Sequence, residues 1–491
     1  MVANPDVQLH YWTIWWWAQA LQMHPLQVWD APQFVPYPYT LAYSDHLAAL
    51  GIIAAPFVWL NVPIAGILNG VMVGSAFATI WAMYALVRSE GALQWPALLV
   101  ALVVTFGAFR SAHLVHLQMQ MTWMLPVAVL WFRRAVLALH LWSWTFVGLL
   151  LVMAASFSLS SYHTLMFVPV LGMTAVAMWF STPHTMRMSV TWRMAIISVG
   201  CVIVMIPAVW PYIQAQQITG ITRTVTEQTN WSAPLQAWFA TADSHPVWPR
   251  IFGDKVVGRA ELALAPGLLL SIGTLIAMRY LHRKQVLWLV VIATGFILAS
   301  GTVLRLYDGD TGLSLPFAKI LASMPGYSAL RVPARWGWLV SCGMAVLAAL
   351  GWSRIVAANK RWLVLAICCL LIDLSWPQLR LKPVPQSTTV PSVVNWMATQ
   401  SPVTTILELP FKPQMQSNTQ ADRLWWQTIH HQRSVTGYSG LIPATQVLLA
   451  RDAAHLPRVD VLARVQAMDI ARIVVYRGSA DGEKLATAMR D

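Results

Sequence analysis

Positive charge is missing from residues 1–62, although the whole chain carries a formal net charge of +13. The segment contains no Lys or Arg, but it contains the acids Asp6, Asp30 and Asp45. In a membrane protein, segments without Lys and Arg tend to lie outside the cytoplasm. We therefore expect residues 1–62 to form an extracytoplasmic loop.

Charge of either sign is scarce in the whole chain. Only 10% of the 491 residues are charged and 57% are hydrophobic, whereas soluble domains carry about 25% charged residues. The Lys and Arg residues stand in short clusters between apolar runs and form no basic face for phosphates. We therefore expect a polytopic membrane protein whose partner is the lipid bilayer, and we exclude nucleic acid as a partner.

Cysteine is also rare. The four cysteines lie inside apolar runs, so we expect small buried side chains and no disulfide framework. A cleavable signal peptide is not recognisable, because the first apolar stretch, residues 11–23, is short and follows no basic region. Since a loop that begins outside the membrane needs a means of export, we expect one more helix ahead of Met1.

Apolar runs of spanning length predict an α-helical bundle of about ten transmembrane helices. The predicted spans are residues 63–88, 93–110, 115–132, 135–156, 161–181, 194–213, 261–280, 286–301, 335–353 and 362–376. We therefore assign residues 1–376 to a transmembrane domain, with residues 1–62 as its first outer loop.

Residues 377–491 predict a small α/β domain. Strand-like runs occupy residues 404–409 and 473–476, and residues 443–468 have apolar positions at helical spacing. With residues 1–62 outside, every second loop of the bundle is basic, which places this C-terminal domain outside the cytoplasm. The basic loops contain Arg88, Arg133-Arg134, Arg187 with Arg193, Arg279 with Arg283-Lys284, and Arg354 with Lys360-Arg361.

Aromatic side chains are dense in residues 1–62, with Trp15-Trp16-Trp17 at the centre of the first apolar stretch. Trp and Tyr favour the lipid headgroup layer, so we expect an aromatic platform at the outer membrane surface. Two interpretations stay open at this point: an interfacial anchor, or a platform whose acid acts on a lipid-linked substrate. Asp45-His46 precedes an apolar stretch, where Ser44 or Asp45 is expected to cap a helix.

Polar side chains at the start of the third predicted span are candidates for a cavity. His113 and His116 are three residues apart and are expected to share a helix face, with Gln118 following them. Such side chains line a cavity, pack at the interface or bind a metal. A zinc site needs a third ligand, and none is adjacent in the sequence.

Two arginines mark the outer entrance of another span. Arg331 and Arg335 suit a phosphate group, with headgroup contact as the alternative, because guanidinium binds phosphate bidentately. Glu261 lies at a similar entrance. Asp308 and Asp310 have the spacing of a divalent-cation site, although the same residues favour a turn. The cofactor therefore stays open, with a divalent cation as the candidate.

Several of these stretches resemble bacterial multi-pass proteins of the GT-C glycosyltransferase superfamily. The resemblance covers nearly the whole chain and is specific for a largely uncharacterised subgroup. It rests on Asn4-Pro5-Asp6, Asp30-Ala31-Pro32-Gln33-Phe34-Val35-Pro36, Thr40-Leu41-Ala42-Tyr43-Ser44-Asp45-His46, the stretch Arg110…His113…His116…Gln118…Trp123…Pro126, Leu330-Arg331-Val332-Pro333-Ala334-Arg335, and Gly437-Tyr438-Ser439-Gly440.

The resemblance implies a bacterial inner-membrane enzyme that takes a sugar from a polyprenyl-phosphate carrier. It also implies that a first-loop acid, matched here by Asp6, acts as general base on the acceptor hydroxyl. Arg331 and Arg335 would then bind the donor phosphate, and Asp45, His46, Arg110, His113, His116, Gln118 and Glu261 would line the cavity. The alternatives are a binder or transporter of lipid-linked sugars on the same scaffold, and a truncated, non-catalytic member that binds partners.

Overall fold

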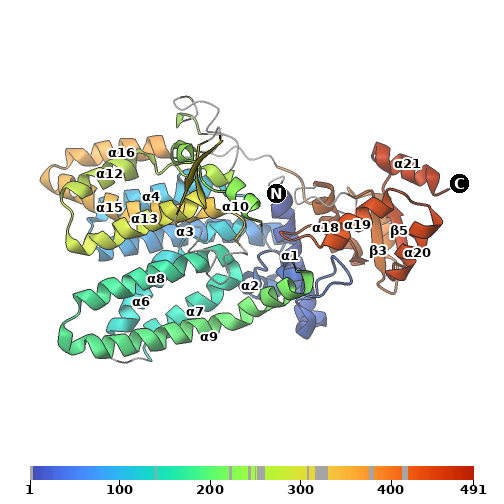
Figure 1. The fold of residues 1–491 in the computed structure, drawn as a ribbon, viewed down its shortest axis with the longest axis horizontal. Coiled ribbons are helices and arrows are strands. Elements are labelled where there is room, and N and C mark those ends of the chain that lie inside the picture. The colour runs from blue at the N-terminus through green and yellow to red at the C-terminus, as the bar shows by residue number, and fades with distance from the viewer. Residues whose placement is uncertain are drawn as a thin grey trace. The chain divides into compact units, whose positions relative to one another are not determined.

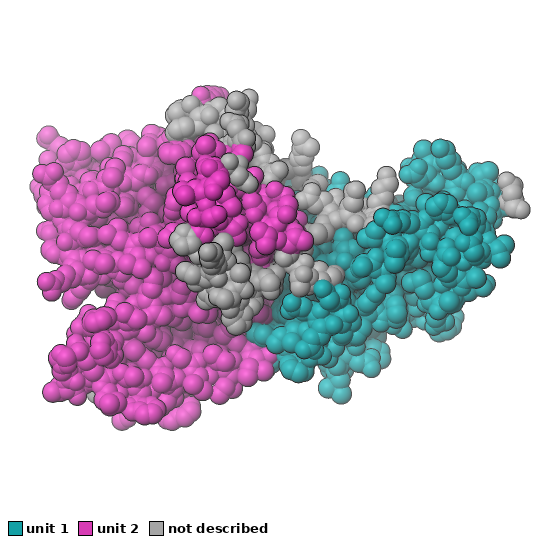
Figure 2. All heavy atoms as spheres, in the orientation of Figure 1, with its two compact units in different colours: residues 1–70, 207–221, 379–491 teal, residues 71–206, 222–378 magenta. Residues whose placement is uncertain are grey.

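The computed structural model describes residues 4–138, 140, 142–220, 224–241, 245–248, 250, 260–306, 309–315, 330–374, 381–386, 388–411 and 418–490. Most of these residues are helical (Figure 1). The chain divides into two compact units, shown in Figure 2. Unit 1 comprises residues 1–70, 207–221 and 379–491, and unit 2 comprises residues 71–206 and 222–378. Residues 1–62 thus group with the C-terminal region, whereas the sequence assigned them to the membrane domain, an assignment that stays a prediction.

Seven helical segments among the described residues are long and apolar enough to cross a membrane. They are Ile64–Ser89, Gln94–Ala112, Ser161–Ser181, His184–Thr219, Ala260–Arg279, Arg283–Ser300 and Pro333–Ala358. The chain is therefore a helical protein of membrane type. Three other predicted spans are shorter helices here, namely α6 (Met124–Leu137), α7 (Trp144–Leu159) and α16 (Arg361–Asp373).

Two groups of helices build unit 2 (Figure 1). In one group, α6 and α7 pack against α8 (Ser161–Ser181). In the other, α15 (Gly337–Ala358) packs against α12 (Gly267–Arg279) and α13 (Val286–Ser300), with α4 (Gln94–Phe106) and α16 beside it. Helices α12 and α15 approach closely at glycines, since a Cβ on Gly351 would lie 2.0 Å from the Gly273 carbonyl oxygen.

Further helices and two strands belong to the described part of unit 2. They are α3 (Ile64–Ser89) and α9 (Arg187–Thr219), which both continue into unit 1, with α5 (Ala108–Ala112), α10 (Val225–Asn230), β1 (Val303–Leu306) and β2 (Gly309–Ser314). Strands β1 and β2 form an antiparallel hairpin in which Arg305 and Asp310 are partners. Asp308 lies outside the described residues.

The basic loops of unit 2 contact one another. Arg133 Nη1 lies 2.5 Å from Glu90 Oε1, and the Leu93 N–H donates to Ser353 Oγ at 2.8 Å. In the same region, Arg193 donates to the Val136 carbonyl at 3.3 Å, and Arg354 Nη2 lies 3.2 Å from His282 Nε2. These contacts link all five predicted basic loops, so their positive charge gathers at one end of the bundle, as the alternation of charge along the chain predicts.

The C-terminal part of unit 1 is an α/β domain. Its parallel strands lie in the order β4-β3-β5, namely β4 (Arg433–Ser434), β3 (Thr405–Leu409) and β5 (Arg472–Val475), so both predicted strands are confirmed. Its helices are α17 (Ser392–Ala398), α18 (Asn418–His430), α19 (Ala444–Ala453), α20 (Val459–Ala467) and α21 (Ala480–Ala488).

Alternating side chains of β3 fill two cores. Ile406 packs against Val394 of α17, whereas Leu407 belongs to the core that contains Leu449 of α19 and Val461 of α20. Successive side chains of a strand point to opposite faces, so helices cover both faces of this small sheet.

The first segment packs onto this domain within unit 1. It consists mainly of α1 (Pro5–Met23) and α2 (Ala48–Trp59). The Trp12 indole of α1 donates to the Gln427 amide oxygen of α18 at 2.8 Å. Trp12 is fully buried, and Trp15, Trp17, Phe34 and Tyr43 are buried too. The predicted aromatic platform in the headgroup layer is therefore wrong for these side chains, because their rings fill the interior of unit 1.

His46 holds the start of α2 in place of the predicted caps Ser44 and Asp45. Helix α2 begins at Ala48 without a side-chain cap at Leu47. Instead, the Ala48 N–H donates to His46 Nδ1 at 3.1 Å, and His46 Nε2 lies 3.2 Å from the Ala208 carbonyl oxygen. The imidazole is therefore neutral with its hydrogen on Nε2, and burial lowers the pKa of His46 to about 4.

Unit 1 is expected to lose stability as the pH falls below the ordinary histidine pKa of 6.5 towards the His46 value of about 4. In that window the unfolded chain binds the proton and the folded chain does not, so acid favours unfolding, by about 2 kcal/mol at pH 5. The measurement is thermal unfolding in detergent at pH 7 and pH 5. In His46→Gln this loss should shrink; an equal loss in both proteins would contradict the prediction. The loss of stability that remains in His46→Gln includes a contribution from His430, because burial lowers the pKa of His430 to about 3.

Candidate functional site

A buried ion pair lies at the end of the unit 2 helices remote from the basic loops. Glu261 stands just before α12 and Arg335 just before α15, whereas Arg279 and Arg354 lie in the last turns of these helices or close to them. Arg335 donates through Nε and Nη2 to the two Glu261 oxygens at 3.0 and 2.6 Å. Both side chains are 8% exposed. Such a bidentate pair fixes both side chains in one orientation.

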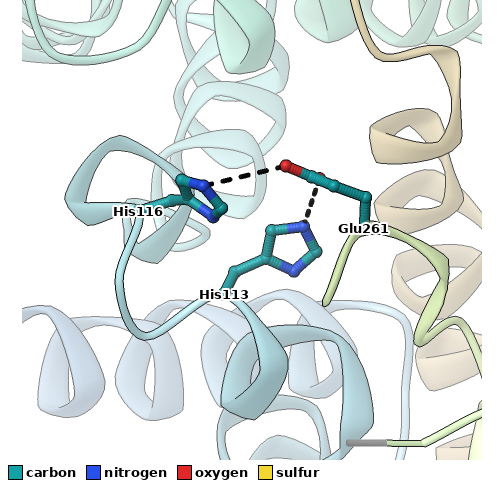
Figure 3. A group of neighbouring side chains, drawn as sticks. All are labelled: His113, His116 and Glu261. Carbon is teal, nitrogen blue, oxygen red and sulfur yellow. Dashed lines mark hydrogen bonds and ion pairs between the residues drawn. The ribbon is translucent and has the colours of Figure 1, made fainter. Parts of the chain in front are cut away.

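Two histidines complete this cluster. His113 Nε2 lies 2.7 Å from Glu261 Oε2, and His116 Nε2 lies 3.9 Å from Glu261 Oε1. Figure 3 shows both rings directed at the Glu261 carboxylate. Three of the predicted cavity residues thus meet at one point, together with the predicted phosphate ligand Arg335.

A break in helical structure makes this meeting possible. The predicted start of the span 115–132 is wrong, because Leu117–Gln120 form a 3-10 turn and α6 begins only at Met124. His113 and His116 therefore do not share a helix face. Non-helical backbone at membrane depth persists only where protein or water satisfies its polar groups.

Arg110 and Gln120 satisfy the backbone of this break. The Gln120 amide donates to the carbonyls of Arg110 at 3.0 Å and of His113 at 2.8 Å. Arg110 is buried and donates to Ser75 Oγ at 2.6 Å. The predicted cavity residue Arg110 thus supports the loop that carries the histidines, and Gln118 is buried in the same loop.

Two residues of α8 that no sequence motif indicated also face this cluster. The Arg335 guanidinium carbon lies 4.5 Å from the Tyr162 ring centre, and the Tyr162 hydroxyl accepts the backbone N–H groups of Arg331 and Val332, each at 3.0 Å. His163 follows and is fully buried. The polar stretch Ser160-Ser161-Tyr162-His163-Thr164, which separates two apolar runs, is a signal that could have identified them.

Arg331 forms a more exposed ion pair in the same unit. Its Nε lies 3.0 Å from Glu227 Oε1, and both side chains are 27% exposed. The guanidinium carbon also lies 5.3 Å from the Trp231 ring centre. Both predicted phosphate ligands are thus paired with a carboxylate in this structure, and their phosphate role stays a prediction.

Asp6 lies in unit 1, in the first turn of α1. The Tyr438 hydroxyl donates to Asp6 Oδ1 at 2.7 Å, and the Tyr438 N–H donates to the Gln33 amide oxygen at 3.2 Å. A Cβ on Gly437 would lie 2.6 Å from the same Gln33 oxygen, so a larger residue there would displace the Gln33 amide. The Gly-Tyr-Ser-Gly stretch therefore packs against the first segment, and the two contact each other at the Asp6 carboxylate.

The other predicted residues of unit 1 are Asp45 and His46. His46 accepts the Ala48 N–H at the start of α2, and its Nε2 contacts Ala208, in the part of α9 that belongs to unit 1. The ligand atoms of His113, His116 and Glu261 all lie within 4.8 Å of one another, so these three side chains are close enough together to bind one metal ion.

No protein-family model matches the chain, and no curated protein matches it in sequence.

Proposed function

We propose that the protein is a GT-C-type glycosyltransferase of a bacterial inner membrane. It moves a sugar from a polyprenyl-phosphate carrier to an acceptor outside the cytoplasm. The proposal includes about ten spans, with the short helices α6, α7 and α16 among them, and an extracytoplasmic C-terminal domain. The gathering of basic loops at one end of unit 2 supports this orientation.

The observation that carries the proposal is the hydrogen bond between Tyr438 and Asp6. Two stretches that underlie the resemblance, Asn4-Pro5-Asp6 and Gly437-Tyr438-Ser439-Gly440, are separated by most of the chain, and the Tyr438 hydroxyl joins them through the Asp6 carboxylate at 2.7 Å. A carboxylate held in a fixed orientation suits a general base, which must lie within hydrogen-bond reach of the acceptor hydroxyl.

In the proposed reaction, the arginines stabilise the phosphate of the carrier. As the glycosidic bond to the carrier breaks, the phosphate gains negative charge, which a guanidinium stabilises. Arg331 is the better placed of the two predicted ligands, because its pair with Glu227 is more exposed than the pair of Arg335 with Glu261. A phosphate would displace Glu227 from Arg331, and Arg331→Ala is expected to raise the KM for the donor.

The test is transfer by the purified full chain in proteoliposomes that contain a radiolabelled polyprenyl-phosphate sugar. Membrane extract supplies the acceptors, and the readout is label in a new glycosidic bond. Transfer that exceeds that of empty and heat-inactivated vesicles supports the proposal. If label moves across the bilayer or stays bound to the protein without a new bond, the chain is a transporter or a binder of lipid-linked sugars instead.

A further inference from the structure

We infer that His113, His116 and Glu261 form a zinc-binding site with an open fourth position. This inference concerns unit 2 alone and does not depend on the glycosyltransferase proposal. Two imidazoles and a carboxylate are a common ligand set for zinc. The third ligand, which the sequence does not place near the histidines, comes from a residue 148 positions after His113.

Both ring nitrogens of His113 face acceptor oxygens, so either a proton or a metal ion lies between Nε2 and Glu261. His113 Nδ1 lies 2.7 Å from the Phe109 carbonyl oxygen, an acceptor, so Nδ1 carries a hydrogen. In the neutral ring, Nε2 would then present a lone pair to Glu261 Oε2 at 2.7 Å, and the two lone pairs would repel each other. A proton on Nε2 relieves this repulsion, and so does a metal ion bound to both atoms.

The distances agree with a metal after small adjustments. Zinc binds imidazole nitrogen and carboxylate oxygen at about 2.0–2.2 Å, so two ligand atoms of a tetrahedral site lie about 3.4 Å apart. His113 Nε2 lies 2.7 Å from Glu261 Oε2 and His116 Nε2 lies 3.9 Å from Glu261 Oε1, so the distances to the two carboxylate oxygens stand on either side of this value. The His113 bond to Phe109 is the kind of outer contact that fixes the tautomer of a metal-binding histidine.

Arg335 would become the outer partner of the carboxylate. The Nε and Nη2 groups of Arg335 donate to both Glu261 oxygens and hold the carboxylate toward the histidines. Replacing the His113 proton by Zn²⁺ adds one unit of positive charge to a buried site that already contains Arg335. An anionic fourth ligand, such as hydroxide or a phosphate oxygen, would cancel that charge. His116 is 14% exposed, the most exposed side chain of the three, and marks the side from which this ligand enters.

The test is metal analysis of the full chain, purified in detergent through a tag without histidine and dialysed against chelator-free buffer. Inductively coupled plasma mass spectrometry should find close to one zinc per chain in the wild type and less than a tenth of that in His116→Ala. His184→Ala, which removes an exposed histidine of the same unit, should retain the wild-type content. Size-exclusion chromatography checks that each variant is folded.

Cobalt substitution provides a second readout that does not depend on zinc retention. Co²⁺ added to the metal-stripped protein should give the strong visible absorption of tetrahedral coordination in the wild type and in His184→Ala. His116→Gln, which keeps a polar side chain of similar size, should lose this absorption while remaining monodisperse. Zinc below a tenth of an equivalent in the wild type, or equal zinc and equal spectra in all variants, would overturn the inference.

Discussion

Replacing Asp6 by Asn is expected to lower sugar transfer about 10²–10⁴-fold, the usual contribution of a general base. The Asn side chain has nearly the same shape, and its amide oxygen can still accept the Tyr438 hydroxyl, which lies 2.7 Å from Asp6 Oδ1 in the wild type. The amide cannot take a proton from the acceptor hydroxyl. We therefore expect a fall in kcat with little change in the KM for the donor and with the unfolding temperature retained.

Asp422→Asn is the matched control for this experiment. Asp422 is also a partly buried acid of unit 1 that contacts α1, since Asp422 Oδ1 accepts the Gln8 amide at 2.6 Å and pairs with Lys382 at 2.5 Å. Its substitution should leave transfer close to the wild-type rate. Tyr438→Phe removes the contact that orients Asp6, so it should reduce transfer less than Asp6→Asn does. Wild-type turnover in Asp6→Asn would reject Asp6 as the base.

Replacing Glu261 by Ala is expected to destabilise the protein by about 3–5 kcal/mol, the usual cost of removing one member of a buried ion pair. The Arg335 guanidinium would lose both carboxylate contacts while only 8% of its side chain is exposed, and His113 would lose its partner at 2.7 Å. Burial makes this loss large, because little water can replace the carboxylate. Chemical unfolding in detergent, after treatment with chelator to remove any metal contribution, measures the effect.

Glu227→Ala tests whether burial is the cause. Glu227 forms the same kind of pair, with Arg331 at 3.0 Å in the same unit, but both side chains are 27% exposed. Water can solvate the remaining arginine there, so the expected loss is well below that of Glu261→Ala. Equal losses in the two variants would show that the pair of Glu261 with Arg335 contributes no more than a solvated pair.

Local patterns of the sequence identify the helical, membrane-type character of the chain and both strands of the C-terminal domain. Apolar runs and short basic clusters are local properties, and so is a strand such as Thr405–Leu409. The break between His113 and Met124 was not predictable in this way, because its polar side chains also fit the start of a helix. The Gln120 amide donates to the carbonyls of Arg110 and His113, ten and seven residues earlier, and such side-chain contacts within a loop leave no trace in the apolar pattern.

By itself, the sequence determined where the charge, the apolar runs and the acids lie along the chain, because the bilayer acts on each segment according to its own composition. Only the tertiary structure decided that Glu261 meets His113 and Arg335, at separations of 148 and 74 residues, and that Tyr438 meets Asp6 across 432. The physical reason is that a buried charge needs a partner of opposite charge or a hydrogen bond. The packing of helices, and not the spacing of residues along the chain, determines which partner is within reach.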